Sequence, residues 1–230
     1  MVMKVKFQQI LSMKYLISQS VKIKDNGTKF NYLDEGYTRY FNHIGIKLIP
    51  VDNLENEISD YLNNDIHGVI LSGSGDIKKI VNSGISERKP VFSHERDITE
   101  NKLIEYTISN NLPLIGICHG MQKINDFFGG KIQPYFHCKK ETYSEQGIFH
   151  DIRGLDDLIG KNITYSINQY HDHCILEDDL AKDLKCFAVD VRFNTVEGFY
   201  NNKNKILGIQ WHPERKINDD IAKEIIHNFI

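Results

Sequence analysis

Short apolar runs alternate with amphipathic segments along the first 130 residues of the chain. Four of the runs are bounded by Gly, Pro or polar residues, a pattern that predicts buried β-strands. These strands are expected over residues 15–19, 45–51, 68–73 and 112–118. Four further segments carry apolar side chains at helical intervals and predict amphipathic helices. The helices are expected over residues 32–44, 54–63, 98–111 and 119–130.

The pattern changes after residue 130, where β-rich segments with turn residues between them take over. These segments cover residues 185–191, 195–202 and 205–210. Residues 201–205 predict a hairpin loop, and an Asn-Asp-Asp sequence ahead of the last amphipathic stretch predicts a capped C-terminal helix. The segment 133–150 is the least patterned. It is either a long functional loop or an ordinary surface excursion.

The alternation of buried strands with helices predicts an α/β fold. A mainly parallel sheet covered on both faces suits buried strands of this kind, and the C-terminal strand pairs should add antiparallel strands. The expected architecture is therefore a flavodoxin-like three-layer sandwich with antiparallel additions in its C-terminal half. We expect a single domain over residues 13–230, with residues 1–12 as an N-terminal extension.

Composition narrows the functional classes. The chain has 230 residues, a formal net charge of −3 and only short basic runs, which argues against a nucleic-acid surface. No apolar stretch approaches the roughly 20 residues of a membrane helix, and the N-terminus lacks the features of a signal peptide. The four Cys do not resemble a disulfide framework. These observations favour a cytoplasmic protein that binds neither nucleic acid nor membrane.

The first candidate for chemistry is Cys118, which lies between Gly116 and Gly120 where a predicted strand meets a predicted helix. A nucleophile on such a sharp turn needs small residues two positions before and after it. The helix N-terminus would favour the thiolate, and the His119 N–H would face a developing oxyanion. A buried structural Cys is the alternative, and the glycines alone do not decide between the two.

A Cys nucleophile needs a base and a group that orients it. His212 follows a short apolar strand, Pro213 restricts the chain after it, and Glu214 lies two positions on. The chain has ten His, so His212 alone is weak evidence and a surface turn residue is the alternative.

Gly73-Ser74-Gly75 follows another predicted strand, and such a turn can offer backbone N–H groups to an anion. Lys78 stands where a dinucleotide fingerprint needs its third Gly, so an oxyanion loop fits better than a phosphate loop. A plain turn is the remaining alternative.

A zinc site is a further alternative that the spacing does not favour. Its ligands would come from two clusters of His and Cys in poorly patterned segments. These residues are His137, Cys138, His171, His173 and Cys174.

Taken together, the motifs resemble the class I glutamine amidotransferase superfamily, and within it the γ-glutamyl hydrolase-like branch. Two segments carry most of the resemblance: 112–130, which holds Cys118, and 206–215, which holds His212 and Glu214. Three others resemble the family less closely. They are the loop segment 69–77, the Arg-Asp segment 93–106 and the segment 168–175.

The resemblance implies roles for individual residues. Cys118 would be the nucleophile, His212 the base and Glu214 the group that orients it. Backbone N–H groups would form the oxyanion hole, and other side chains would contact the γ-glutamyl substrate or brace the site. The implied oxyanion donors come from Gly73, Ser74, Gly75 and His119, the substrate contacts from Gln122, Tyr170 and His171, and the bracing from Arg96 and Asp97.

The implied activity is cleavage of a small γ-glutamyl conjugate to glutamate and the free amine through a γ-glutamyl thioester, without metal or organic cofactor. A γ-glutamyl-CDP-amidate or a γ-glutamyl amine are candidate substrates. The alternative is a glutaminase subunit that supplies ammonia to a separate synthetase partner, and a non-enzymatic interaction module is a third reading. The segments 133–150 and 171–174 should shape the pocket for the leaving amine, and Lys139-Lys140 either meets a phosphorylated leaving group or is exposed charge.

Overall fold

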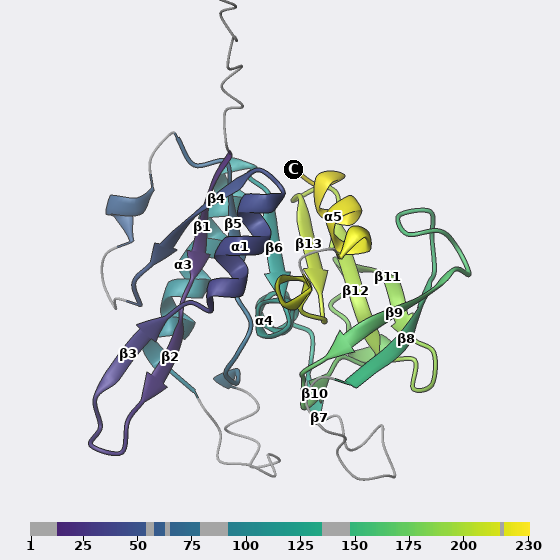
Figure 1. Cartoon of the computed structure of the whole chain (residues 1–230), viewed down its shortest axis with the longest axis horizontal. Coiled ribbons are helices and arrows are strands. Elements are labelled where there is room, and N and C mark those ends of the chain that lie inside the picture. Colours follow the sequence, from purple (N-terminus) through teal and green to yellow (C-terminus); the bar gives the residue numbers. More distant parts are fainter. Residues whose placement is uncertain (1–12, 54–57, 63–64, 79–91, 135–147, 217–218) are drawn as a thin grey trace, which may run out of the picture.

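The computed structural model describes residues 13–53, 58–62, 65–78, 92–134, 148–216 and 219–230. Its centre is a nine-stranded sheet with the strand order β4-β1-β5-β6-β13-β12-β11-β8-β9 (Figure 1). In that order the strands are β4 (Ile46–Val51), β1 (Met13–Ser18), β5 (Gly68–Leu71), β6 (Leu114–Ile117), β13 (Ile206–Ile209), β12 (Val196–Asn201), β11 (Lys185–Asp190), β8 (Ile148–Gly154) and β9 (Thr164–Gln169).

The sheet has a parallel half and an antiparallel half, as the sequence predicts. The pairs from β4 to β13 are all parallel, whereas the pairs from β13 to β9 are all antiparallel. The expected hairpin loop at 201–205 joins β12 to β13. The flavodoxin-like α/β prediction is therefore confirmed.

Helices cover both faces of the parallel half. On one face α1 (Glu35–His43) and α5 (Asp220–His227) pack with alternate strand residues such as Ile115 and Ile117. On the other face α3 (His94–Asn110) and α4 (His119–Phe127) pack with residues of opposite parity such as Leu114. Because successive strand side chains point to opposite faces, each strand contributes to both cores. This explains why the strand sequences are continuous apolar runs.

The helix ends follow local capping chemistry. The helix expected at 98–111 begins earlier, at His94, because the Ser93 hydroxyl accepts a hydrogen bond from the Arg96 N–H at 3.2 Å. Its first turn is polar, so apolar periodicity alone did not mark it. The C-terminal helix is capped as expected, since Asp219 Oδ1 accepts from the Ala222 N–H at 3.0 Å.

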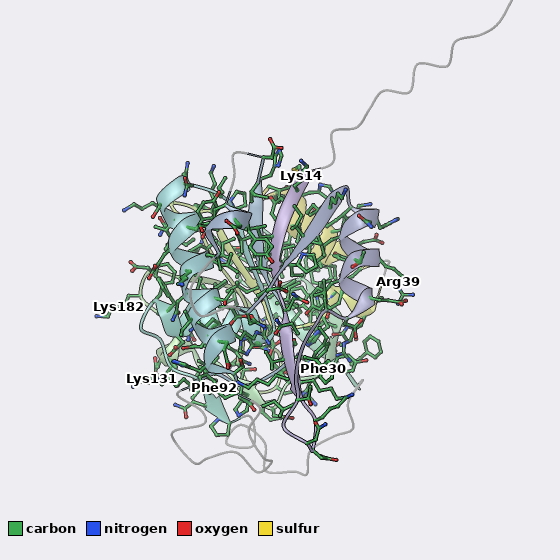
Figure 2. All side chains as sticks on the ribbon, turned by 90° about the vertical axis from the view of Figure 1, so that its left-hand side faces the viewer. Lys14, Phe30, Arg39, Phe92, Lys131 and Lys182 are labelled. Carbon is green, nitrogen blue, oxygen red and sulfur yellow. The ribbon has the colours of Figure 1, made fainter. Side chains whose placement is uncertain are left out.

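A hairpin of β2 (Ser20–Ile23) and β3 (Lys29–Tyr32) was not foreseen from the sequence. It projects from the carboxyl end of the sheet, and Phe30 lies on it (Figures 1 and 2). Phe30 is 40% exposed and Tyr32 39% exposed. The hairpin buries little apolar surface, so it lacks the clear alternation that signals a strand packed on a core.

Parts of several predicted segments lie outside the described residues. These parts are 1–12, 54–57, 63 and 135–147, and the last range includes Lys139-Lys140. The described part of the segment expected as a helix at 54–63 holds a 3-10 turn, Ser59–Tyr61. The described ends of the segment 133–150 are the short strand β7 (Gln133–Pro134), paired with β10 (His173–Cys174), and the start of β8. The boundaries of a single domain over 13–230 stay a prediction.

Candidate active site

Cys118 lies on a sharp turn between β6 and α4. Its backbone has φ 51° and ψ −104°, a combination that L-residues rarely adopt and that is typical of strained functional positions. A Cβ on Gly116 would lie 2.6 Å from the Gly120 carbonyl carbon, and a Cβ on Gly120 would lie 2.1 Å from the Leu71 carbonyl oxygen. The two glycines are required because strand and helix approach this closely, as in a nucleophile elbow.

The three predicted functional segments meet at the carboxyl ends of adjacent strands. The loop at 72–75 follows β5, Cys118 follows β6, and His212 and Glu214 follow β13. These strands are neighbours in the sheet, and open α/β sheets place their ligand sites at such edges. The fold thus brings together residues that lie far apart in the sequence, from Ser72 to Glu214.

His212 and Glu214 form a buried pair. His212 Nδ1 lies 2.6 Å from Glu214 Oε1, and the two residues are 4% and 6% exposed. Burial opposes protonation of the imidazole, but the negative charges of Glu214 and of a Cys118 thiolate outweigh burial and raise the pKa of His212 to about 10. A thiolate beside an imidazolium is the reactive form of many Cys nucleophiles.

The backbone of His212 is fixed by Asn168 on β9. Asn168 Oδ1 accepts from the His212 N–H at 2.9 Å, and Asn168 Nδ2 donates to the His212 carbonyl oxygen at 2.8 Å. This reciprocal pair ties the end of β13 to the antiparallel half of the sheet. Asn168 lies in one of the family-like segments of the sequence, but its spacing carries no signal of this contact.

Tyr37 on α1 connects the loop after β5 to Glu214. The Tyr37 hydroxyl accepts a hydrogen bond from the Gly73 N–H at 2.7 Å. Burial, followed by the negative charge of Glu214, raises the pKa of Tyr37 well above its usual value. A Cβ on Gly73 would lie 2.7 Å from His212 Cε1, so this position packs directly against the imidazole. Since the Gly73 N–H has an acceptor, Ser74 and Gly75 are the remaining candidate donors of this loop.

Arg96 binds the carbonyl groups of the same loop. Its guanidinium donates to the Ser74 carbonyl oxygen at 2.6 Å and to the Ser72 carbonyl oxygen at 2.7 Å. Ser74 adopts φ 76°, a left-handed backbone that Gly would adopt at lower cost. The arginine fork therefore stabilises a loop conformation that its own sequence disfavours.

Glu100 completes this bracing network from inside α3. Its carboxylate accepts from Arg96 Nε at 2.8 Å and lies 2.9 Å from His119 Nε2. Burial alone would raise the pKa of Glu100, but the charges of Arg96 and His119 hold that pKa well below its usual value. Next to it, Lys123 Nζ lies 2.5 Å from Asp97 Oδ1. Both residues of the predicted Arg96–Asp97 brace are thus in ion pairs around the site.

Gln210, directly after β13, contacts the Cys118 sulfur and is itself bound by Gln122 from α4. Gln210 Nε2 lies 3.6 Å from Cys118 Sγ, and Gln122 Nε2 lies 3.3 Å from Gln210 Oε1. Gln122 also donates to the His173 carbonyl oxygen at 3.2 Å. Gln210 was not singled out from the sequence, although it ends the strand that leads to His212.

An open cavity of about 1150 Å³ extends from Cys118 to the molecular surface. Most of the predicted site residues line it. They are Ser74, Gly75, Cys118, His119, Gln122, Tyr170, His171 and His212. Glu214 and Gly73 are not among its lining residues and act from behind His212.

The cavity is lined by basic side chains and by the acidic side chains of Asp25 and Asp172. Lys22 and Lys24 line it from the β2–β3 hairpin, and Arg215 lines it from the turn after His212. The Arg215 guanidinium lies 3.9 Å from the centre of the Tyr170 ring, and the Tyr170 ring lies 5.5 Å from that of His212. Arg215 thus places a positive charge over the Tyr170 ring, and that ring meets the His212 ring edge to face.

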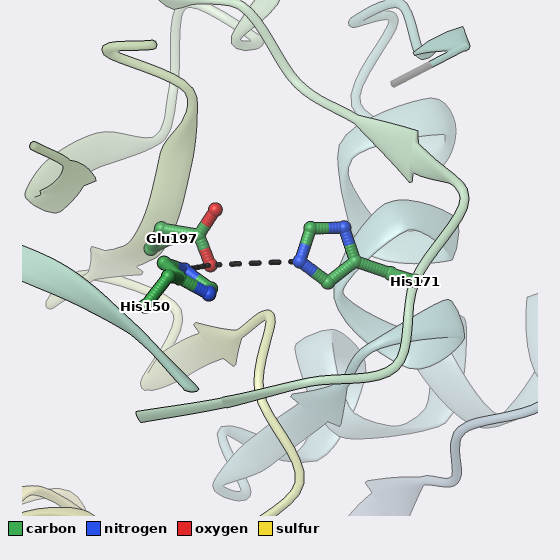
Figure 3. Close-up of side chains that lie close together, drawn as sticks. All are labelled: His150, His171 and Glu197. Carbon is green, nitrogen blue, oxygen red and sulfur yellow. Dashed lines mark ion pairs between the residues drawn. The ribbon is translucent and has the colours of Figure 1, made fainter. Parts of the chain in front are cut away.

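The five residues proposed from the sequence as zinc ligands do not form one site among the described residues. His137 and Cys138 lie outside the described residues, and His173 lies 3.7 Å from Asp76. Among the described residues, the group that could hold a metal ion is a different one, formed by His150, His171 and Glu197 (Figure 3).

Of the described helices, none has the length and apolarity that crossing a membrane would require.

Comparison with known proteins agrees with this geometry. Residues 12–214 match the family model for peptidase C26. The γ-glutamyl-CDP-amidate hydrolase of Campylobacter jejuni is 31% identical over 159 residues, which are 68% of this chain and 66% of that protein. Anthranilate synthase component 2 of Cyanophora paradoxa is 29% identical over 214 residues, 90% of this chain and 95% of that protein.

A solved structure shows the same fold. The crystal structure of a glutamine amidotransferase from Thermotoga maritima aligns over 95% of this chain and 82% of that one, with a TM-score of 0.61 and 16% sequence identity. The family match covers the elbow, the loop after β5 and the His212–Glu214 segment. The chain therefore belongs to the peptidase C26 family, within the class I glutamine amidotransferases.

Proposed function

We propose that this protein is a cysteine-dependent hydrolase of the γ-glutamyl amide bond in a small γ-glutamyl conjugate. The observation that carries the proposal is the position of Cys118 on a strained elbow, beside a buried His212–Glu214 pair and at the floor of an open cavity. Membership of the peptidase C26 family supports a hydrolase that acts on C–N bonds.

The proposed reaction begins when Cys118 Sγ attacks the γ-carbonyl carbon. The imidazolium of His212 then protonates the leaving nitrogen, which releases the amine and leaves a γ-glutamyl thioester on Cys118. The neutral imidazole next takes a proton from water, which hydrolyses the thioester to glutamate and restores the thiolate–imidazolium pair. Glu214 orients the ring and stabilises its charge throughout.

We expect two backbone N–H groups to hold the tetrahedral oxyanion. His119 is the first residue of α4, so its N–H is one of the helix N-terminal donors that have no intrahelical acceptor. Ser74 or Gly75 supplies the second donor, because the Gly73 N–H is bound to Tyr37. Ser20 Oγ holds the Gly73–Ser74 peptide, which carries the Ser74 N–H, by donating to the Gly73 carbonyl oxygen at 2.9 Å. Arg96 holds the next peptide, which carries the Gly75 N–H, by donating to the Ser74 carbonyl oxygen.

The outer cavity favours an anionic leaving group. Lys22, Lys24 and Arg215 surround the path away from Cys118, and Tyr170 offers an aromatic face beside them. Asp25 and Asp172 also line the cavity, so its basic side chains outnumber its acidic ones by three to two. A leaving amine that carries phosphate groups complements this excess of positive charge. The Campylobacter jejuni relative named γ-glutamyl-CDP-amidate hydrolase supports the same choice.

Glutamate release from purified protein tests the proposal. A panel of substrates would contain a γ-glutamyl conjugate of a phosphorylated amine, a neutral γ-glutamyl alkylamide and free glutamine. We expect release from the first without any other protein, and none from the Cys118→Ala variant. If only glutamine is cleaved, and only after a synthetase is added, the protein is instead the ammonia-supplying subunit that names such as anthranilate synthase component 2 suggest.

A further inference from the structure

A second cluster of ionisable side chains lies behind the cavity, in the antiparallel half of the sheet. His150 comes from β8, Glu197 from β12, and His171 from the segment between β9 and β10 (Figure 3). His150 and Glu197 take no part in the proposed reaction. The side chains of all three are at most 1% exposed.

The three side chains point toward one another. His150 Nε2 lies 3.5 Å from Glu197 Oε2, and His171 Nε2 lies 3.9 Å from the same oxygen. One ligand atom from each residue lies within 4.8 Å of the other two. Tetrahedral zinc with ligand bonds of about 2.0–2.1 Å needs ligand atoms about 3.3 Å apart. Small side-chain movements would reach that spacing.

The interior of the cluster lacks hydrogen bonds. Among the described residues, no hydrogen-bond partner is found for either ring nitrogen of His150, for Glu197 Oε2 or for Asp190 Oδ2. Asp190 Oδ2 lies 3.6 Å from His150 Nε2. Buried polar groups nearly always have hydrogen-bond partners. This many buried polar atoms without such partners around one point indicate that a ligand binds between them.

Two of the three residues, His171 and Glu197, make outer hydrogen bonds that orient them toward the centre of the cluster. His171 Nδ1 donates to the His173 carbonyl oxygen at 2.9 Å, which directs the lone pair of Nε2 toward Glu197. Glu197 Oε1 accepts from the Thr195 hydroxyl at 3.1 Å, which leaves Oε2 facing the two imidazoles. Partners of this kind fix the tautomer and orientation of metal ligands.

The charge of the cluster favours a cation. Glu197 and Asp190 are both 0% exposed, and buried carboxylates need compensating positive charge. Asp190 Oδ1 accepts from the backbone N–H groups of Arg192 and Phe193, and its Oδ2 lies 3.6 Å from the half-exposed Arg192 guanidinium. Glu197 has no Lys or Arg ion-pair partner among the described residues. A divalent ion would neutralise it.

We propose that His150, His171 and Glu197 bind a divalent transition-metal ion of the zinc type. Two imidazoles and one carboxylate suit such an ion better than magnesium or calcium, which prefer oxygen ligands. The site is structural, because the side chains of its ligands are at most 1% exposed and because His150 and Glu197 are not among the residues that line the cavity with Cys118. The ion ties β8 and β12 to the segment that carries Tyr170 and His171, and so fixes one wall of the substrate cavity.

The first experiment measures metal content and thermal stability of the full chain. Protein purified without chelator should hold about one equivalent of zinc by mass spectrometry, and dialysis against 1,10-phenanthroline should remove it. Adding Zn²⁺ back at a hundredfold excess over its dissociation constant should raise the melting temperature by roughly 5–10 °C. Absence of both the metal and the shift would overturn the proposal.

Variants then locate the ion. Glu197→Gln and His150→Asn should lose the zinc-dependent shift, whereas His227→Asn, which changes an exposed His on α5, should keep it. Equal zinc binding by all three variants would place the ion elsewhere and overturn the assignment. If the cluster variants do not fold, anomalous diffraction at the zinc edge from wild-type crystals decides, since it must show a peak between His150, His171 and Glu197.

This proposal is separable from the proposed function. The Cys118→Ser variant should bind zinc with the same stoichiometry, because Cys118 is not a ligand. Loss of γ-glutamyl hydrolysis with zinc retained would count against the function alone. Hydrolysis without any bound zinc would count against the metal site alone.

Discussion

The Tyr37 hydroxyl accepts a 2.7 Å hydrogen bond from the Gly73 N–H, so helix α1 is tied to the loop that borders the candidate nucleophile. The same hydroxyl faces Glu214, whose charge contributes to the raised pKa of Tyr37. One phenol therefore connects the loop, Glu214 and the first helix. Its removal should affect all three.

We expect Tyr37→Phe to lower kcat for glutamate release. The variant leaves the Gly73 N–H without its acceptor, which should cost about 1–3 kcal/mol of stability and loosen the adjoining donor at Ser74 or Gly75. Steady-state kinetics with denaturant unfolding would measure both effects. Tyr40→Phe is the matched control, because the Tyr40 hydroxyl on the same helix is buried with no hydrogen-bond partner among the described residues. A Tyr37→Phe variant with the activity of Tyr40→Phe would contradict this role.

Glu214→Gln should lower the pKa of His212 from its value of about 10. Loss of a neighbouring opposite charge commonly lowers a pKa by about 1–3 units. NMR titration of the His212 ring signal, assigned with a His212→Gln variant, would measure the change. An unchanged titration would show that Glu214 does not control this imidazole.

The same pair predicts how stability depends on pH. A His whose folded-state pKa lies above its unfolded value contributes stability that is complete below about 6.5 and is lost as pH rises toward 10. The difference in unfolding free energy between wild type and Glu214→Gln should therefore be largest near pH 6–7 and shrink above it. Urea unfolding across pH 6–10 tests this, and a difference that grows with pH would contradict it.

Arg96→Ala should destabilise the protein by about 3–5 kcal/mol, because it leaves the Glu100 carboxylate buried with one partner fewer. Arg96 and Glu100 are 4% and 0% exposed, and Arg96 also holds the carbonyl groups of the loop. Arg39→Ala is the control: Arg39 pairs with Glu35 at 3.5 Å on the surface of α1, and such exposed pairs contribute about 0–1 kcal/mol. Comparable losses in the two variants would rule out the bracing role.

Arg215→Gln should raise the KM for a γ-glutamyl conjugate of a phosphorylated amine about tenfold, because a charge-assisted hydrogen bond contributes roughly 1.5–3 kcal/mol and is partly screened here. The KM for a neutral γ-glutamyl alkylamide should stay nearly unchanged. Arg39→Gln, which lies away from the cavity, should change neither value. Raising the salt concentration should weaken the wild-type preference. An equal KM increase for both substrates would mean that Arg215 orients Tyr170 and His212 rather than binding the leaving group.

Local sequence accounts for most of the helices and strands. The buried strands and amphipathic helices around the parallel sheet follow from apolar runs and helical spacing, because each element must bury a defined face. The early start of α3 and the β2–β3 hairpin were missed for one reason: their residues bury little apolar surface, so neither shows a period.

The sequence by itself also determined where the reactive groups stand along the chain. Gly116 and Gly120 mark the elbow at Cys118 because the backbone itself needs them, and Glu214 lies close to His212 in the chain. Only the tertiary structure decided which distant groups complete the site. Tyr37, Asn168 and Gln210 act through contacts between strands and helices far apart in the sequence.

The cluster of His150, His171 and Glu197 is the clearest case of this division. Each residue lies on a different segment, and no local spacing relates the three. They meet because β11 and β12 return antiparallel beside β13 and bring β8 and the end of β9 with them. Hydrophobic periodicity specifies which face of a strand is buried, but the pairing of strands across the sheet specifies which buried polar groups face one another.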